Sequence, residues 1–241
     1  MEPTEPAVTT AALLTGGSHR LRKNPRIVGV FFLVGVLIAG IDFLRRGDPV
    51  PTASFSGIQA GTVSLRFGLL VDVVFRQSTP ISALVDLQPR WLVWTVALEL
   101  VRGGALVIAS VYAYTQLLDE TATLASAARY GCVMLVFTLA AVDIDSGLLL
   151  GLPLGIVAVY LVVRFAPVSA LLATGTPIQS TFRASWQMTR GHGWSLFGVV
   201  LVVGLANHLL ASIPLVGSVG SSLTAAVHVA VITAFVEHTS T

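Results

Sequence analysis

The chain alternates between long apolar segments and short polar stretches, a pattern that predicts helices crossing a membrane. A span needs about 20 mostly apolar residues to cross the hydrocarbon core of a bilayer. Segments close to this length occupy about residues 27–44, 91–118, 125–142, 147–174, 194–212 and 215–236. We therefore expect an all-α fold: a polytopic transmembrane helix bundle of about six spans, accompanied by interfacial amphipathic helices.

The first interfacial helix is predicted at residues 58–75, where apolar residues recur at helical spacing. Arg66 and Asp72 lie within this segment, and such charges are costly to leave facing lipid. The pattern favours a helix that lies in the interface or re-enters the membrane. A true span is the alternative, and it would place the C-terminus on the outer side.

The second interfacial helix is predicted at about residues 177–190, a segment too short and too polar to span. Ile178, Phe182 and Trp186 fall along one side of it, whereas Arg183 and Arg190 face elsewhere. A helix with one apolar face and basic residues on the other is typical of the membrane interface.

Gly191 and Trp194 directly follow this second helix. A glycine is suited to end a helix, because it adopts the left-handed backbone conformation freely. Trp194 is placed to anchor the next span at the depth of the lipid headgroups.

The N-terminal residues 1–19 are rich in Pro, Thr, Ala and Gly and show no periodic pattern. They are typical of a disordered tail. Residues 20–241 then form one transmembrane helical domain.

The positions of the basic residues predict which end of the bundle faces the cytoplasm. With six spans, one side receives Arg20, Arg22, Lys23, Arg26, Arg183 and Arg190. The other side receives nearly as many: Arg45, Arg46, Arg66, Arg76 and Arg90. Because cytoplasmic loops carry an excess of Lys and Arg, the small difference favours a cytoplasmic N-terminus.

Composition supports a multi-pass protein of the plasma membrane. Hydrophobic residues make up 54% of the chain and charged residues only 11%, against about 25% charged in soluble domains. The mean hydropathy is +0.84. The net charge of +2 comes with no dense basic run, which argues against nucleic acid as a partner. Arginine outnumbers lysine strongly, a hint of a GC-rich prokaryotic genome, and the single cysteine excludes an internal disulfide.

A distinctive motif covers Val163–Leu205. A span ends in Arg, an aromatic residue and Pro, and a helix then carries Arg-x-Ser-Trp and Thr-x-Gly before an aromatic residue opens the next span. These positions are Arg164, Phe165, Pro167, Arg183, Ser185, Trp186, Thr189, Arg190, Gly191 and Trp194.

This stretch resembles polytopic membrane proteins related to the glycerophosphoryl diester phosphodiesterase membrane domain and the YciC-like proteins. The resemblance implies a six-helix integral membrane protein. The phosphodiesterase branch also carries a soluble catalytic barrel with paired carboxylates, His and a metal. No stretch of this chain is long or polar enough to be that barrel, so the enzymatic activity is not carried over.

Glu99 and Arg102 form a candidate intramembrane polar site, because they lie within a predicted span and on one helix face. The structural interpretation is an intrahelical pair that is neutralised and turned into the bundle. Arg164, near the end of its span, either extends to the interface or holds a lipid phosphate or an acidic partner.

Known catalytic patterns are missing from the sequence, which contains no phosphate loop, HExxH, GxSxG or Cys/His ligand spacing. His208 and His228 are expected at different depths, which favours hydrogen bonds between helices over a shared metal. We therefore predict no catalytic residues, no metal and no cofactor, and thus a protein that is not an enzyme.

The favoured function is that of a lipid- or partner-interacting membrane component of an envelope or transport complex. Its partners would be membrane lipids and other membrane proteins or an ATPase subunit. The predicted contact residues are Arg164, Arg183, Trp186, Arg190 and Trp194. The alternative is a transporter or permease subunit with a polar path near Glu99, Arg102 and Arg164.

Overall fold

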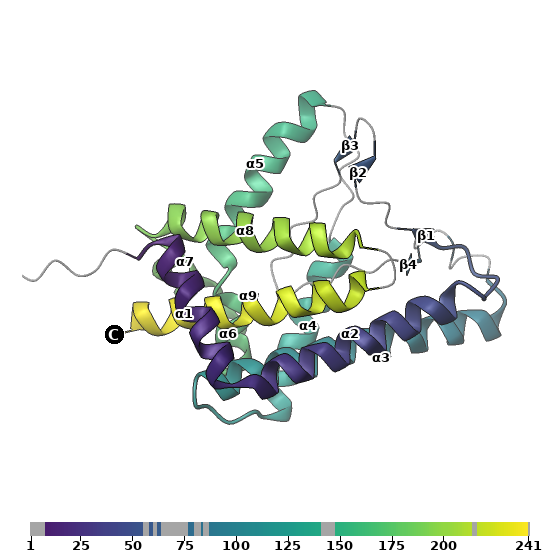
Figure 1. Ribbon diagram of the computed structural model, residues 1–241, viewed down its shortest axis with the longest axis horizontal. Coiled ribbons are helices and arrows are strands. Elements are labelled where there is room, and N and C mark those ends of the chain that lie inside the picture. Colours follow the sequence, from purple (N-terminus) through teal and green to yellow (C-terminus); the bar gives the residue numbers. More distant parts are fainter. Residues whose placement is uncertain are drawn as a thin grey trace, which may run out of the picture.

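The computed structural model describes residues 8–54, 58–59, 62–63, 77–79, 83, 87–140, 148–213 and 216–240. Its fold is predominantly α-helical (Figure 1). Four of the helices described are long and apolar enough to cross a membrane: α2 (Pro25–Arg45), α3 (Pro89–Leu117), α8 (Gly193–Ala211) and α9 (Gly217–Ser240). This arrangement fits a membrane protein and confirms four of the predicted apolar helices.

The third and fourth predicted spans correspond to α4 (Leu124–Ala140) and α5 (Leu148–Phe165). Their fully described apolar parts are shorter, Leu124–Phe137 and Gly155–Phe165. The single helix expected over residues 147–174 is wrong at its C-terminal end, because α5 stops at Phe165 and α6 (Val168–Ala173) follows. Pro167 explains the break, since it has no backbone N–H and cannot continue the helix of α5.

The N-terminal prediction is wrong for residues 10–19. Thr10–Lys23 form helix α1, which begins where the Thr9 side chain accepts a hydrogen bond from the Ala12 N–H. Leu13 is buried, and α1 packs against α9 and α8. Tertiary packing thus stabilises a segment whose composition is typical of a tail. Residues 1–7 lie outside the described residues.

Short strands replace the start of the helix predicted at residues 58–75. β2 (Ile58–Gln59) pairs with β3 (Thr62–Val63), and β1 (Ala53–Ser54) pairs with β4 (Gln77–Ser78), both antiparallel. The β-branched Ile58, Thr62 and Val63 favour strand pairing. The remainder of the predicted helix, 60–61 and 64–75, lies outside the described residues.

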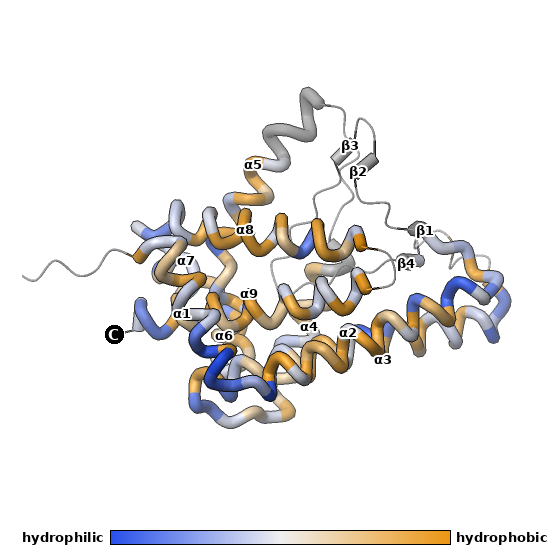
Figure 2. Tube along the Cα trace, in the orientation of Figure 1, coloured by the Kyte–Doolittle hydropathy of each residue, from blue (hydrophilic) through white to orange (hydrophobic). Residues whose placement is uncertain are grey.

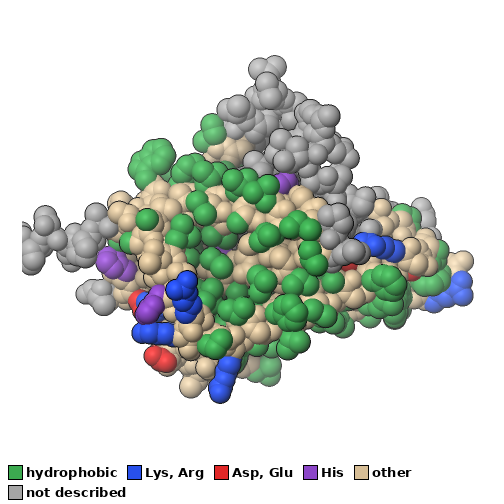
Figure 3. Space-filling model, viewed as in Figure 1, with side chains coloured by type: hydrophobic (Ala, Val, Ile, Leu, Met, Phe, Trp, Pro, Cys, Tyr) green, Lys and Arg blue, Asp and Glu red, His purple; other side chains and the backbone are tan. Residues whose placement is uncertain are grey.

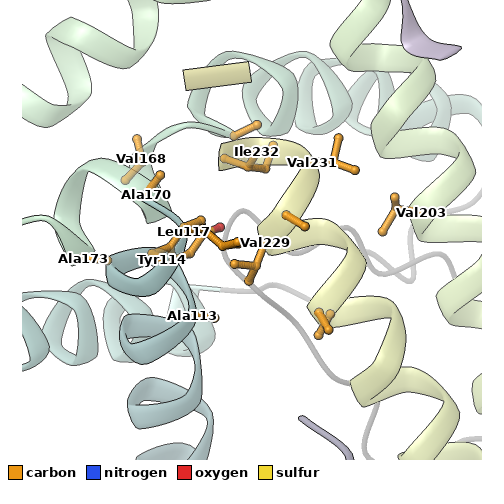
Figure 4. Packing of buried hydrophobic residues seen from close by; sticks show 14 of the residues in the cluster. Ala113, Tyr114, Leu117, Val168, Ala170, Ala173, Val203, Val229, Val231 and Ile232 are labelled. Atoms are coloured by element: carbon orange, nitrogen blue, oxygen red, sulfur yellow. The ribbon is translucent and has the colours of Figure 1, made fainter. Parts of the chain in front are cut away.

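Helix α9 is the centre of the bundle and packs against α1, α2, α3, α6 and α8 (Figure 1). Val229, Ala230, Val231 and Ile232 are consecutive in the chain and each is 0% exposed. A surface helix buries only one face, so these residues show that neighbours surround this part of α9. Figure 4 shows where the end of α3 and α6 meet α9, with Tyr114 pointing into the contact.

The contacts between the long helices fix their directions. Asp42 of α2 contacts Arg102 of α3, whereas Arg45, further along α2, contacts Thr95, earlier in α3. The two helices are therefore antiparallel, and the bond from Thr224 of α9 to Asn207 agrees with α8 and α9 as an antiparallel pair. We call the end where α2 and α8 begin and α3 and α9 finish the basic end, and the opposite end the far end.

Hydrophobic residues recur along the long helices (Figure 2), and hydrophobic side chains are spread over the face of the molecule in Figure 3. Leu33 of α2 is 66% exposed, Val93 and Leu100 of α3 are 69% and 70% exposed, and Ile108 is 69% exposed. Soluble monomers rarely expose continuous apolar surface on this scale. Such surface matches the hydrocarbon core of a bilayer.

Candidate functional site

A cluster of charged residues joins α2, α3 and α9. The Arg102 guanidinium donates a hydrogen bond of 2.8 Å to Oδ1 of Asp42, and the Ser218 hydroxyl donates one of 3.0 Å to Oδ2 of the same carboxylate. Arg102 is 1% exposed and Asp42 is 3% exposed. One buried ion pair therefore connects three helices, and its parts come from distant places in the chain.

Glu99 is the outer member of this cluster. Nη1 of Arg102 lies 3.2 Å and 3.3 Å from the two Glu99 carboxylate oxygens. The intrahelical pair predicted from the sequence is thus confirmed. The Glu99 side chain is 40% exposed, however, whereas that of Arg102 is 1% exposed, so only the arginine is turned into the bundle.

Arg45 forms a second buried ionic contact directly next to this cluster. Its guanidinium donates to the Thr95 hydroxyl at 2.8 Å, approaches the Asp48 carboxylate at 3.3 Å, and bonds the Thr79 hydroxyl. Arg45 is 2% exposed. These bonds hold the end of α2 against the first third of α3.

These contacts also place the cluster by depth. Asp42 lies about one helical turn before the last residue of α2, and Ser218 is the second residue of α9. Glu99 and Arg102 fall within the first half of the longer helix α3. The pair therefore lies about one turn inside the end of α2 and beside the start of α9, whereas α3 continues for almost three turns beyond Glu99.

Sequence reasoning missed Asp42 and Ser218 as partners of Arg102. In the sequence, Asp42 lies near the end of the first apolar segment, 27–44. A signal was available, because a carboxylate followed by apolar residues within a helix needs a buried partner. Nothing in the spacing of the sequence indicates which of the later arginines supplies it.

A second cluster joins α5 to α7 (Ile178–Met188), the helix predicted at about residues 177–190. The Arg164 guanidinium lies 5.2 Å from the ring centroid of Tyr160 and 5.1 Å from that of Trp186. Its Nε donates to the Tyr160 hydroxyl at 3.1 Å, and its Nη1 donates to the Thr189 hydroxyl at 3.4 Å. Arg164 is therefore engaged by the protein itself.

The backbone of Arg164 is tied to α7 as well. The Ser185 hydroxyl donates a hydrogen bond of 2.8 Å to the Arg164 carbonyl, one of those at the helix end that have no partner within α5. Phe165 packs edge-on against Phe182 with ring centroids 5.3 Å apart. The motif residues of α5 and α7 thus contact one another, and their shared role is to fix the angle between these two helices.

Arg183, Arg190 and Trp194 lie on the outside of the same region. Both arginines are exposed, and Trp194 is 86% exposed. Gly191 follows α7 with φ of +83°, which confirms the predicted left-handed end of the helix. The five predicted contact residues therefore divide into an engaged pair, Arg164 and Trp186, and an exposed set of three.

Hydrogen bonds between α8 and α9 gather on Asn207, the residue before His208. Its side-chain oxygen accepts hydrogen bonds from the hydroxyl groups of Ser221 and Thr224, the latter at 2.9 Å. Within the part of the chain that the structure describes, no group of three or more His, Cys, Asp or Glu residues is arranged to hold a metal ion.

Comparisons of the chain with protein-family models, with curated proteins and with solved structures gave no match. The resemblance of Val163–Leu205 to a membrane-protein family remains a prediction from the sequence. The arrangement of the two clusters is therefore the basis for any functional conclusion.

Proposed function

We propose that the chain is a multi-pass protein of a prokaryotic plasma membrane that works through contacts with lipids and partner proteins, without catalysis of its own. The four long apolar helices and their exposed apolar surface support this proposal. In it, α4 and α5 supply two further spans, which makes six. The bundle would be a membrane component of an envelope or transport complex.

The distribution of charge supports a cytoplasmic basic end. Among the described residues, that end carries Arg20, Arg22, Lys23, Arg26, Arg129, Arg164, Arg183 and Arg190. The far end carries Arg45, Arg46 and Arg90. Arg66 and Arg76, which the sequence places between α2 and α3, lie outside the described residues and reduce the difference without reversing it. Because cytoplasmic segments are enriched in Lys and Arg, both described ends of the chain, α1 and the close of α9, face the cytoplasm in this proposal.

The observation that carries the lipid contact is the outward position of Arg183 and Arg190 beside Trp194 at the basic end. Arg164 and Ser185 hold α7 in place, so Arg183 on the helix and Arg190 in the turn after it are both exposed at the basic end. Exposed guanidinium groups bind phosphate oxygens well, and tryptophan favours the headgroup region. Together these residues suit the anionic headgroups of the cytoplasmic leaflet.

The double variant Arg183→Gln/Arg190→Gln tests this contact. In bilayers of mixed phosphatidylglycerol and phosphatidylcholine, each arginine near the surface contributes about 1 kcal/mol of attraction to anionic lipid. The preference of the protein for spin-labelled phosphatidylglycerol should therefore fall several-fold in the variant. The charge-conserving variant Arg183→Lys/Arg190→Lys should keep it, and an unchanged preference in the glutamine variant would overturn the proposal.

A transporter subunit is the second candidate, and the exposed Glu99 side chain beside buried Arg102 favours it. A polar path through the bundle would continue from Glu99 toward Asp42 and Ser218. Arg164, the third residue of the predicted path, lies toward the basic end and is held by Tyr160 and Thr189. The enclosure of Asp42 and Ser218 is the reason to prefer the contact function.

Accessibility of Ser218 to water distinguishes the two candidates. In a Cys132→Ser background, Ser218→Cys would react with a membrane-impermeant maleimide if a polar path reached it. A contact protein with a dry seam between α2, α3 and α9 should protect the cysteine from both sides. Gly47→Cys, beyond the end of α2, provides the positive control for labelling.

A further inference from the structure

Glu99 is the one member of the far-end cluster that points out of the bundle. Its side chain is 40% exposed, and among the described residues its carboxylate accepts hydrogen bonds only from Arg102. The same guanidinium makes its shorter bond, 2.8 Å, to Asp42. One buried arginine thus serves two carboxylates, and the closer carboxylate is the buried one.

The surface around Glu99 is apolar and open. On α3, Val96 is 43% exposed and Leu100 is 70% exposed. Gly103, one turn after Glu99, has no neighbouring atom within 4 Å of the position that a Cβ would occupy. These four residues, Val96, Glu99, Leu100 and Gly103, form a continuous strip that we call the Glu99 face.

A carboxylate on such a face is unfavourable within a membrane unless it has a polar partner. The cost of leaving it toward lipid is substantial, and ionisable residues in spans normally find a partner. Arg102 meets only part of that need, because its stronger bond is directed to Asp42. The strip of small and apolar residues around Glu99 would let another helix approach closely.

We propose that the Glu99 face receives a membrane-spanning helix of a different protein, which carries a Lys or Arg about one turn inside the far end. This inference rests on the proposed function and names the surface and the chemistry of its partner. The positive side chain would pair with Glu99, while Leu100 and Gly103 pack against the backbone and apolar side chains of the incoming helix.

A second copy of the chain does not supply this complement. Two copies that met through this face about a two-fold axis would bring two Glu99 carboxylates together, and like charges at close range repel. Among the described residues, Arg45 and Arg102 are buried at this depth, and Arg164 lies toward the opposite end. The exposed Arg46 and Arg90 lie beyond this depth, at the end of α2 and the start of α3. Charge complementarity therefore indicates a heterologous partner.

Designed transmembrane peptides provide a defined probe for this face. Three leucine-rich peptides of about 20 residues would carry a single lysine one turn from an end, a single lysine at the centre, or no lysine. The full-length protein, labelled at its one cysteine, Cys132, which is exposed, would be reconstituted with each in phosphatidylcholine vesicles. Energy transfer between the labels then measures association.

The peptide with lysine near its end should associate about fivefold more strongly than the one without lysine, the size expected for one polar contact between helices in a bilayer. Glu99→Gln should remove that difference, because it removes the negative charge. The glutamine oxygen can still accept a hydrogen bond from Arg102, so the contact within α3 is kept. Gly103→Leu should weaken binding of every peptide by blocking the face. Gly40→Leu is the matched control, because Gly40 on α2 also has open space around it.

Equal binding of the peptides with and without lysine would overturn this inference, and so would an unchanged preference in Glu99→Gln. Energy transfer between two copies of the protein that Gly103→Leu abolishes would overturn it in favour of a homodimer. Extraction of the vesicles with alkali distinguishes failure of the partner inference from failure of the proposed membrane function. A protein that alkali removes is not integral, whereas a retained protein that ignores the lysine refutes only the partner.

Discussion

Arg102 of α3 and Asp42 of α2 are 60 positions apart in the chain and form a buried ion pair of 2.8 Å. This pair determines how the first two long helices align along their lengths. Both groups are buried, so the loss of either one removes a short ionic contact from a buried partner. The Ser218 hydroxyl extends the same contact to α9, which makes the pair the polar centre of the far end.

Removal of the Asp42 carboxylate should destabilise the bundle. In Asp42→Ala, Arg102 stays buried and loses its 2.8 Å bond to a buried carboxylate. Breaking one side of a buried ion pair costs about 3–5 kcal/mol, which unfolding in mixed detergent micelles would measure. The double variant Asp42→Ala/Arg102→Leu should recover part of this loss, and a double variant less stable than Asp42→Ala would contradict the account.

The seam between α2 and α9 depends on close backbone approach at Gly35. A Cβ at this position would lie 2.7 Å from Cα of Val219, so Gly35→Val forces the helices apart. Overpacking of this kind costs about 1–3 kcal/mol, and the same micelle unfolding assay would detect it. Gly29→Val on the same helix has open space and should leave the unfolding midpoint nearly unchanged.

The bond from Ser185 to the Arg164 carbonyl should stabilise the junction of α5 and α7. Ser185 is 0% exposed, so Ser185→Ala leaves the carbonyl without its partner from α7. Loss of such a bond costs about 1–3 kcal/mol. Ser180→Ala, an exposed serine of the same helix that bonds the Pro177 carbonyl, is the control. Equal effects of the two variants would argue against the junction.

Arg20 and Glu237 link α1 to the end of α9 through a two-pronged ion pair. Their side chains are 28% and 40% exposed, so solvent and salt screen the attraction. Glu237→Gln should therefore cost less than about 1 kcal/mol, and raising the salt concentration should erase the difference. A large loss that persists in high salt would show that α1 depends on this pair more than on its apolar contacts.

The local pattern was a reliable guide to the helices that a bilayer requires. The spans predicted at 27–44, 91–118, 194–212 and 215–236 match α2, α3, α8 and α9 within a few residues. Their length and apolar composition are properties of contiguous sequence. In a bilayer such a segment forms a helix, because its backbone N–H and C=O groups have no water to bond and must bond one another. The helix at residues 177–190 and its end at Gly191 could also be predicted, because the spacing of apolar residues and the position of a glycine are local features of the sequence.

Two of the errors in the described residues concern residues 10–19 and the start of the helix predicted at 58–75. Residues 10–19 read as a tail because glycine and threonine are poor helix formers, yet Leu13 of α1 is buried in the bundle. Strands at 58–59 and 62–63 replaced a predicted helix, since β-branched residues can satisfy either pattern. At residues 10–19 the neighbouring helices α8 and α9 select the structure, whereas at 58–63 two parts of the same segment pair with each other.

The sequence by itself determined that this protein folds as apolar helices and that Glu99 and Arg102 pair on one of them. Only the tertiary structure decided that Arg102 turns inward to Asp42 while Glu99 faces outward, and that Arg164 is held by Tyr160 and Trp186. The physical reason is that a helix face follows from spacing of three or four residues. The partner across a helix interface depends instead on which helices pack together and on their relative depth.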